Sequence, residues 1–453
     1  MARKGTILVL VLMILSILSL AVLSQMMLCR GETAVASGNQ RLYQARSAAM
    51  SGIARGLAVL ESNPDDSKLW QDNPELFQAQ LVTAEGGEEW YFTVYADSID
   101  GKTPRYGIED EGGKINLNAA SPDMLLKLLN GRTDLADALM DYLDADAETR
   151  TEGAEQDYYD NLAQPYRIRN GRLSTLEELL LVKGFDGRVV FGNDANRNGL
   201  LEKNEDDGEE SFPPDNADGQ LDTGLRGKAT VITYESDKDR VDLNSAPPQD
   251  LREAGLSQKT VDYIDAYRKS KAGPAFKDAS ELIDAKPVVD DQADPAKKIT
   301  YASDLTATTG NLGTVLDKLT CLGPTRKGQQ IRPGRVNLNT APLSVLMCLP
   351  GLTEQSAQQI FDMRDRMDGP AKASPAWVLT QNVIDASAFK KLAPYATARS
   401  RQFRIRSFGY CPTNGRFCVL EATVDLAGKQ PRLMYLRDLT ALGVPMAAQA
   451  KGP

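Results

Sequence analysis

An uncharged, strongly apolar segment near the start of the chain constrains its fold more than any other feature. Arg3 and Lys4 precede the segment, residues 5–29 carry no charged side chain, and Arg30 ends it. A helix over residues 6–28 is long enough to cross a bilayer, because about 20 helical residues span the roughly 30 Å hydrocarbon core. Basic residues before the span and a long acidic remainder after it predict a cytoplasmic N-terminus and a single-pass anchor.

A secretory signal removed after export is the alternative, because Ser19-Leu20-Ala21 offers a small-residue cleavage site before Val22. A retained helix is favoured by the residues after the span, where apolar side chains continue at helical spacing: Leu42, Ala45, Ala49, Ile53, Leu57 and Leu60. Asn63 then ends the pattern, since a residue before proline resists the helical conformation. We therefore expect one transmembrane and amphipathic helix over residues 6–62.

The composition of the body excludes several functional classes. The 453 residues include 62 acidic, 52 basic and no histidine residues, for a net charge of -10. Without histidine, neither a Ser-His-Asp nor a Cys-His nucleophile system can form, and no zinc site can use imidazole. The negative charge argues against general nucleic-acid binding. Because the sequence also carries no recognisable catalytic constellation, we expect a non-enzymatic protein whose oxygen-rich side chains suit hard cations.

Strand-like segments lie at both ends of the body. They combine aromatic or β-branched composition with alternation, and they cover residues 89–95, 105–117, 402–408, 417–424 and 434–436. Asn414-Gly415 predicts a hairpin turn between the third and fourth of these segments.

The simplest fold is α+β, with one small antiparallel sheet packed on the N-terminal helix. The sheet would come from residues 63–117 and 401–440, and a tail would follow at 441–453. A large inserted all-α domain, residues 118–400, would interrupt the sheet.

A repeated motif begins at the edge of this insert. Three copies read Ile115-Asn116-Leu117-Asn118, Val241-Asp242-Leu243-Asn244 and Val336-Asn337-Leu338-Asn339. Each copy leads into a short helix, a glycine turn and a second helix, which predicts helix-hairpin-helix units near 115–184, 241–290 and 336–392. We expect the asparagine side chains to cap the first helix or to hold the preceding turn.

Helix-hairpin-helix units raise DNA binding as an alternative function, and the motif is similar to one in competence receptors. Such hairpins hold a phosphate on the backbone N–H groups of a Gly-hydrophobic-Gly turn. Thr133, Ser257 and Thr353 stand at or next to the place of the second glycine in the three turns. A packing role is therefore favoured, and a membrane-tethered DNA receptor for DNA uptake remains the alternative.

A calcium-loop pattern lies between the first two units. Residues 194–205 satisfy its spacing, with Gly199 at the sharp turn and oxygen ligands from Asp194, Asn196, Asn198, the Leu200 backbone, Glu202 and Glu205. The alternative is a solvated acidic connector, because residues 192–222 hold ten acidic and two basic side chains. We favour a structural Ca²⁺ ion.

The N-terminus resembles that of type IV prepilins and type II secretion pseudopilins. In that family a prepilin peptidase cuts after the leader glycine, which corresponds here to a cut between Gly5 and Thr6 and a leader of residues 1–5. Most members carry Glu at the fifth position after the cut, where this chain has Leu10. Minor pseudopilin K typically lacks that Glu and has a large body, so the chain resembles the general secretion pathway protein K family.

The first unit carries the same resemblance. Asp144 and Asp146 fall in an Asp-x-Asp loop, and Gly153-Ala154-Glu155, Tyr158-Tyr159 and Pro165-Tyr166 follow in the order typical of pseudopilin K. The resemblance implies a second calcium site at Asp144, Asp146 and Glu155, for which ordinary charge at a helix end is the alternative. The middle unit, near 241–290, is an addition to the family pattern.

The resemblance implies a function and a location. The chain would be a minor pseudopilin that caps the tip of a type II secretion pseudopilus during protein export. Its partners would be minor pseudopilins resembling I and J, the shaft subunits and the prepilin peptidase. It would be anchored in the inner membrane by a single span, with its bulk in the periplasm.

The five cysteines suit an oxidising compartment. Cys411 and Cys418 flank the expected hairpin turn, so we expect a disulfide between them. Cys321 and Cys348 are the other candidates.

Overall fold

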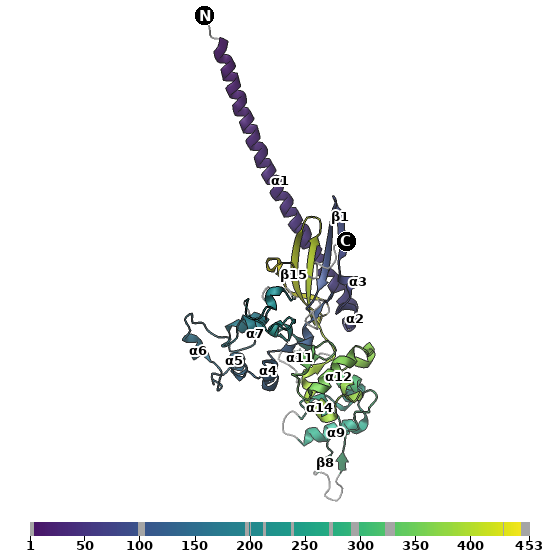
Figure 1. The fold of residues 1–453 in the computed structure, drawn as a ribbon. Helices are drawn as coiled ribbons and strands as arrows, with labels where there is room; N and C mark the ends of the chain where they lie inside the picture. Colours follow the sequence, from purple (N-terminus) through teal and green to yellow (C-terminus); the bar gives the residue numbers. More distant parts are fainter. Residues whose placement is uncertain are drawn as a thin grey trace.

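A single long helix dominates the fold. The computed structural model describes Lys4 to Val444, except for residues 98–104, 195–198, 200, 212–213, 237–239, 271–274, 291–298, 322–330 and 429. Helix α1 (Lys4–Ser62) is continuous, as the sequence predicts. Its first half projects from the body with its apolar side chains exposed (Figure 1). Among the described residues, it is the one helix long and apolar enough to cross a membrane, with a segment of mean hydropathy 3.0.

The second half of α1 packs on an antiparallel sheet, which confirms the predicted α+β class. The strand order is β1-β2-β14-β15-β16, and short β3 pairs with the start of β14. Their bounds are Gln80–Glu85 (β1), Glu88–Tyr95 (β2), Glu109–Asp110 (β3), Gln402–Cys411 (β14), Arg416–Asp425 (β15) and Arg432–Asp438 (β16). The two halves of the sheet, separated by the insert in sequence, meet where β2 pairs with β14.

Small residues let the helix approach the sheet closely. Ala45 and Ala49 are fully buried on α1. A Cβ atom on Gly409 of β14 would lie 2.3 Å from both the Ala45 carbonyl oxygen and the Ala49 nitrogen. No larger residue fits at that point, so Gly409 fixes how closely the helix and the sheet approach each other.

The prediction of a single strand over residues 105–117 is wrong. It is β3, a 3₁₀ turn at Glu111–Gly113 and β4 (Ile115–Asn116), with β4 already part of the insert. Asp110 caps the turn by accepting a hydrogen bond from the Gly112 N–H. Two short helices, α2 (Ser67–Trp70) and α3 (Pro74–Phe77), connect α1 to the sheet.

The hairpin between β14 and β15 does not pair the two cysteines. Its loop has four residues, 412–415, and not two, so Cys411 lies opposite Arg416 while Cys418 lies opposite Gly409. Residues in this diagonal relation are typically about 7–8 Å apart, beyond the usual disulfide range. Both thiols are free, and the expectation of a Cys411–Cys418 bridge is wrong for this structure.

The insert is mainly helical and contains three similar units. Their helix pairs are α4 (Pro122–Leu128) and α5 (Thr133–Leu143), α8 (Pro248–Glu253) and α9 (Gln258–Lys269), and α11 (Leu343–Leu346) and α12 (Glu354–Arg364). Each pair turns at a glycine with a positive φ, at Gly131, Gly255 and Gly351. Further helices are α6 (Gln156–Asp160), α7 (Gly187–Phe191), α10 (Leu312–Asp317), α13 (Trp377–Thr380) and α14 (Ala386–Leu392).

Short parallel ladders close the three units. The repeat motif supplies one strand of each ladder and a distant segment supplies the other: β4 with β5 (Ala229–Thr230), β7 (Val241–Asp242) with β10 (Leu319–Thr320), and β12 (Val336–Asn337) with β13 (Ala396–Thr397). Two antiparallel ladders accompany them, β6 (Tyr234–Ser236) with β11 (Ile331–Pro333) and β8 (Val288–Asp290) with β9 (Ile299–Tyr301). The first two units therefore extend further along the chain than their helical pattern indicates.

The motif asparagines hold turns and do not cap helices. In each copy the first polar side chain accepts the N–H of the residue two places on, as Asn116 does from Asn118. The second asparagine donates to two carbonyl groups on separate segments: Asn118 to Leu173 and Val231, Asn244 to Phe276 and Cys321, and Asn339 to Lys372 and Ala398. In each unit, the asparagine at this position of the motif therefore connects two other segments of the chain.

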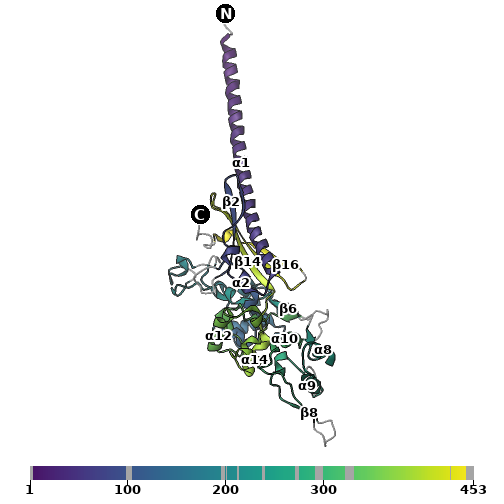
Figure 2. The same cartoon turned by 90° about the vertical axis from the view of Figure 1, so that its right-hand side faces the viewer.

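The insert lies at the end of the sheet remote from the N-terminus of α1. Figures 1 and 2 both show this order along the long axis, with the apolar half of α1 at one end, the sheet in the middle and the helical units at the other end. The bulk of the chain is therefore concentrated far from the membrane segment.

Candidate metal sites

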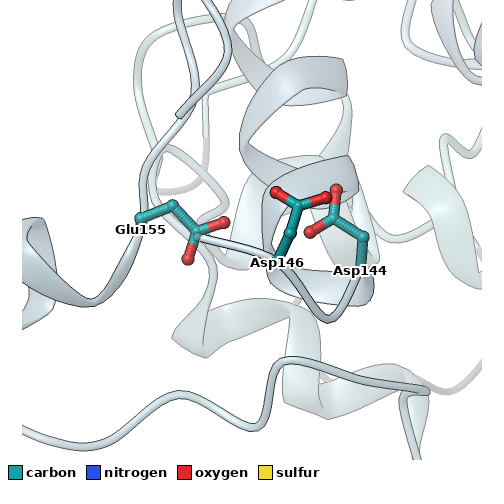
Figure 3. Close-up of side chains that lie close together, drawn as sticks. All are labelled: Asp144, Asp146 and Glu155. Carbon is teal, nitrogen blue, oxygen red and sulfur yellow. The ribbon is translucent and has the colours of Figure 1, made fainter. Parts of the chain in front are cut away.

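Three carboxylates gather where α5 ends. Asp144, Asp146 and Glu155 each offer an oxygen, and these atoms all lie within 4.8 Å of one another. Figure 3 shows Asp144 and Asp146 side by side at the end of the helix, with Glu155 reaching toward them from the segment before α6. Gly153 permits this return of the chain, because a Cβ atom there would lie 1.9 Å from Asp141 Oδ2. The structure therefore brings together the three residues that the family resemblance implies.

Several oxygen atoms in this cluster have no protein partner. Asp144 Oδ1, Glu155 Oε1 and Asn170 Oδ1 are buried and accept no hydrogen bond. Asn170 lies beside the carboxylates, since its Nδ2 donates to the Asp146 carbonyl oxygen (3.0 Å) and to Glu155 Oε2 (3.5 Å). Buried polar atoms normally find a partner, so these oxygens point to a cation or ordered water at the cluster.

The electrostatics of the cluster also favour a cation. Burial raises the pKa of Glu155, and the charges of Asp141, Asp144 and Asp146 raise it further. Arg150 offsets part of this charge by pairing with Asp141 (2.5 Å) and with Asp144 Oδ2 (2.7 Å). Three carboxylates and an amide oxygen match the ligands that Ca²⁺ takes, about six to eight oxygens including water. The residues present therefore fit the ion.

Asn170 is a member of the cluster that the sequence does not predict. It lies 15 residues beyond Glu155, and no metal-loop spacing links the two positions. The sequence holds no such signal, and its φ of 43°, which asparagine tolerates better than most residues, is visible only in the fold.

The predicted calcium loop at 194–205 is described in part. Asn196, Asn198 and Leu200 lie outside the described residues. Asp194 is fully buried, and its Oδ2 accepts the Gly199 N–H at 3.2 Å. Gly199 has a φ of +77°, as its predicted place in the turn requires.

The last residues of this loop form hydrogen bonds with one another. Glu205 is buried, and its Oε2 accepts the Glu202 N–H at 3.1 Å within a capping box formed by these two residues. Buried Asn193 connects the loop to the segment at Asp222, since it donates to the Glu205 carbonyl oxygen and accepts the Asp222 N–H. Glu205 Oε2 therefore already accepts a hydrogen bond from within the loop.

Asp194 belongs to a buried ionic network that reaches the sheet. Its Oδ2 pairs with Arg226 at 2.6 Å, and Arg226 also contacts Asp97 at 3.3 Å. Asp97 pairs in turn with Arg406 of β14 at 2.6 Å. Burial raises the pKa of Asp194 although Arg226 opposes the effect. For Asp97, Arg406 and Arg226 outweigh burial and lower the pKa.

The predicted leader site lies at the start of α1. Gly5 and Thr6 are part of the helix, and the cut between them stays a prediction. Leu10, four residues after Thr6, is exposed on the helix surface.

Comparisons with known proteins agree with the resemblance found in the sequence. Residues 109–191 match a family model described as type II secretion system (T2SS), protein K. A curated relative, type II secretion system protein K of Pectobacterium carotovorum subsp. carotovorum, is 43% identical over 67 residues, which are 14% of this chain and 20% of that protein. The chain thus spans about a fifth of the length of this relative.

One solved structure is also similar. It is a chain of the GspK-GspI-GspJ complex of the type 2 secretion system from enterotoxigenic Escherichia coli, with 11% identity, a TM-score of 0.38 and coverage of 89% of this chain and 98% of that chain. The predicted resemblance to type II secretion protein K is confirmed by the family model and the curated relative, both through a short segment.

Proposed function

We propose that the chain is a minor pseudopilin, similar to protein K, that caps the tip of a type II secretion pseudopilus and takes part in protein export across the outer membrane. The observation that carries the proposal is the order of parts along the molecule: an exposed apolar helix, a sheet packed on its second half, and a bulky insert at the far end (Figures 1 and 2). The match of residues 109–191 to the protein K family model supports it.

The geometry gives a physical reason for a position at the tip. In the proposed assembly, the exposed apolar half of α1 packs beside the apolar helices of other subunits, and the sheet lies outside this helical core. The insert extends this chain beyond its own sheet, on the side away from the membrane. A further subunit above it would meet the insert, so growth stops while subunits below can still pack along α1.

Leu10 suits a subunit at the tip, which has other subunits on its membrane side and none beyond it. A carboxylate in the apolar segment would need a positive partner, because an unpaired charge is expensive in a bilayer. Leu10 needs no such partner. The chain therefore does not require the amino terminus of a preceding subunit in order to assemble.

The proposed partners rest on the resemblance to protein K. The similar chain comes from a complex named for GspK, GspI and GspJ. We assign this chain partners resembling I and J, with the shaft subunits below them and the prepilin peptidase acting at Gly5. The chain is held in the inner membrane by one span, and its body is in the periplasm.

Calcium has a structural role in this proposal. The cluster of Asp144, Asp146, Glu155 and Asn170 holds one ion, and the loop from Asp194 to Glu205 is the second site. When bound, Ca²⁺ supplies positive charge for the gathered carboxylates. Within the chain, Asn170 connects Asp146 to Glu155 by hydrogen bonds, and Asn193 donates to the carbonyl oxygen of Glu205.

N-terminal sequencing of the mature chain from membranes tests the pseudopilin route. Processing by the prepilin peptidase gives a protein that starts at Thr6. A protein that starts at Val22 would show removal of a secretory signal and would overturn the proposal. A gel-shift titration with duplex DNA at physiological salt tests the DNA-receptor alternative, and tight binding would favour that alternative over a capping role.

A further inference from the structure

A cavity lies between the third repeat unit and the segment that follows α1. Its volume is about 570 Å³, and Asp66 and Lys68 of that segment line it together with Asn339, Lys372 and Arg399. Of these five side chains, only Asn339 and Lys372 are buried. The chemistry of these two residues therefore decides which ligand the cavity can hold.

Lys372 stands at a position that the other two units fill with an apolar side chain. The position is defined by its carbonyl oxygen, which accepts a hydrogen bond from the second asparagine of the motif in each unit: Leu173, Phe276 and Lys372. Leu173 and Phe276 are buried in the hydrophobic core of the insert. The third unit therefore has a charged group where its counterparts have a core side chain.

The same comparison shows that one oxygen of Asn339 lacks a partner. In the first unit, Asn118 Oδ1 accepts the Leu173 N–H at 2.7 Å, and in the second, Asn244 Oδ1 accepts the Phe276 N–H at 2.8 Å. In the third unit, Asn339 Oδ1 is buried and accepts no hydrogen bond. Since buried acceptors normally find a donor, this oxygen points to a donor that the described residues do not supply.

Lys372 has no buried counter-charge. Its Nζ donates to the Arg364 carbonyl oxygen at 2.8 Å, and no carboxylate among the described residues pairs with it. Burial lowers the pKa of Lys372 although Asp365 opposes the effect, and Lys68 and Arg364 lower it further. Because an unpaired buried cation is costly, an anion in the cavity would stabilise this group.

We propose that the cavity binds a phosphate group, free or in an ester, with its negative charge against Lys372 and a ligand O–H donating to Asn339 Oδ1. At pH 7 inorganic phosphate carries both the charge and the donor, whereas sulfate carries the charge alone. Lys68 and Arg399 add positive charge at exposed positions of the lining. The site depends neither on calcium nor on the proposed capping role.

The carboxylates around the cavity are engaged elsewhere or exposed. Asp65 pairs with Arg401 at 2.8 Å, and Asp66 caps α2 by accepting the Lys68 N–H at 3.2 Å. Asp368 is exposed, so water and salt screen its charge. These groups therefore leave the buried amine available to a ligand.

A comparison of salts tests the proposal on the full-length chain in detergent, at pH 7 in EDTA. Sodium phosphate, sulfate and chloride are compared at equal ionic strength. Phosphate and sulfate both stabilise folded proteins by exclusion from their surface, so sulfate is the control for that general effect. We expect a higher Tm in phosphate than in sulfate and saturable phosphate binding by calorimetry. Equal Tm values in phosphate and sulfate would overturn the proposal.

Lys372→Leu gives the third unit the side chain that the first unit has at this position. Leucine suits a buried site, so Tm in chloride should not fall. The phosphate Kd should weaken by about tenfold, because a charge-assisted hydrogen bond is lost. Lys277→Leu makes the same change at an exposed lysine of the second unit and should leave phosphate binding unchanged.

The alternative is that Lys372 only caps the end of α12 through the Arg364 carbonyl oxygen. Lys372→Leu would then lower Tm equally in the three salts and leave phosphate binding unchanged, which would overturn the proposal. The salt comparison on the parent chain decides the question even if this variant does not fold.

Glycerol 3-phosphate, titrated beside inorganic phosphate, distinguishes the two sources of the group. Tighter binding of the ester would assign the site to an esterified phosphate, and weaker binding would assign it to the free ion. Either result supports a phosphate site at Lys372.

Discussion

Thr340 of the third repeat unit donates its hydroxyl group to Asp110 of β3 across 230 residues of sequence, with 2.5 Å between Oγ1 and Oδ2. The same carboxylate accepts hydrogen bonds from Ser400 (2.7 Å) and Asn337 (3.1 Å). Burial raises the pKa of Asp110 even though these donors oppose the effect. One buried carboxylate of β3 therefore joins the sheet to the third repeat unit and to the end of the insert.

Thr340→Val tests this joint. Valine keeps the shape of threonine but removes one donor to a buried carboxylate, so we expect unfolding free energy to fall by about 2 kcal/mol. Denaturant unfolding of the full chain in detergent measures it. Thr83→Val on edge strand β1 is the matched control and should change stability by less than about 0.5 kcal/mol. Equal effects of the two variants would contradict the role given to Asp110.

Glu109 predicts how stability depends on pH. Burial alone would raise its pKa, but Lys114, Arg406 and Arg404 outweigh burial and hold the pKa well below the ordinary value of 4.5. Below pH 4.5, Glu109 takes up a proton in the unfolded chain before it does so in the folded chain. The stabilisation that its ion pairs contribute is therefore complete above that pH and is lost as the pH falls toward the lowered pKa of the folded state.

Glu109→Gln checks this dependence. It leaves Lys114 and the arginines with one fewer buried counter-charge, so we expect a loss of about 3 kcal/mol at pH 7. The stability curve should also become flatter below pH 4.5, because one proton-linked group is gone. Glu209→Gln, at an exposed position, should leave the curve unchanged. If the unfolding free energy of Glu109→Gln falls with pH as steeply as that of the wild type, this carboxyl group does not account for the loss of stability in acid.

The cluster at Asp144 predicts a calcium effect on stability. Calcium that binds only the folded chain raises the unfolding free energy, by about 2.7 kcal/mol at a free concentration about a hundred times Kd. Glu155→Gln should weaken the response to calcium, since it removes a carboxylate from the cluster. Glu148→Gln, an exposed change in the same loop, is the control. Melting curves that are identical in EDTA and in calcium would show that neither proposed site binds calcium in the folded chain.

Gly409 predicts a specific defect at the contact between helix and sheet. Gly409→Ala places a methyl group against the backbone of α1, so we expect a loss of about 3 kcal/mol, at the upper end of overpacking effects. Gly187→Ala, where a Cβ atom meets nothing within 4 Å, is the control and should be nearly neutral. Limited proteolysis at the junction of α1 and the body should follow the same order. Equal protection in both variants would contradict the close approach.

Local patterns in the sequence predicted much of the fold. The apolar run and the helical spacing after it predicted α1, and alternation predicted β2, β14, β15 and β16. Strand β1 was missed, although Gly86-Gly87 between two alternating segments is a hairpin signal.

The errors came from contacts between distant residues and from register. Each parallel ladder pairs two residues of a motif with two residues far along the chain, as β4 does with β5, and so short a strand has no periodicity to detect. The cysteine pairing failed because a two-residue turn was assumed where the chain uses four, which shifts the pairing of every facing residue. Asn170 could not be placed in the cluster before the fold brought it beside Glu155.

The position of the insert on the assembled filament shows whether the chain caps the pseudopilus. Gold-labelled antibody against residues 118–400 can be imaged by electron microscopy on pseudopili sheared from cells that produce the full chain. We expect label at one end of each filament and none along the shaft. Label distributed along the shaft, or filaments whose ends carry none, would contradict a capping role.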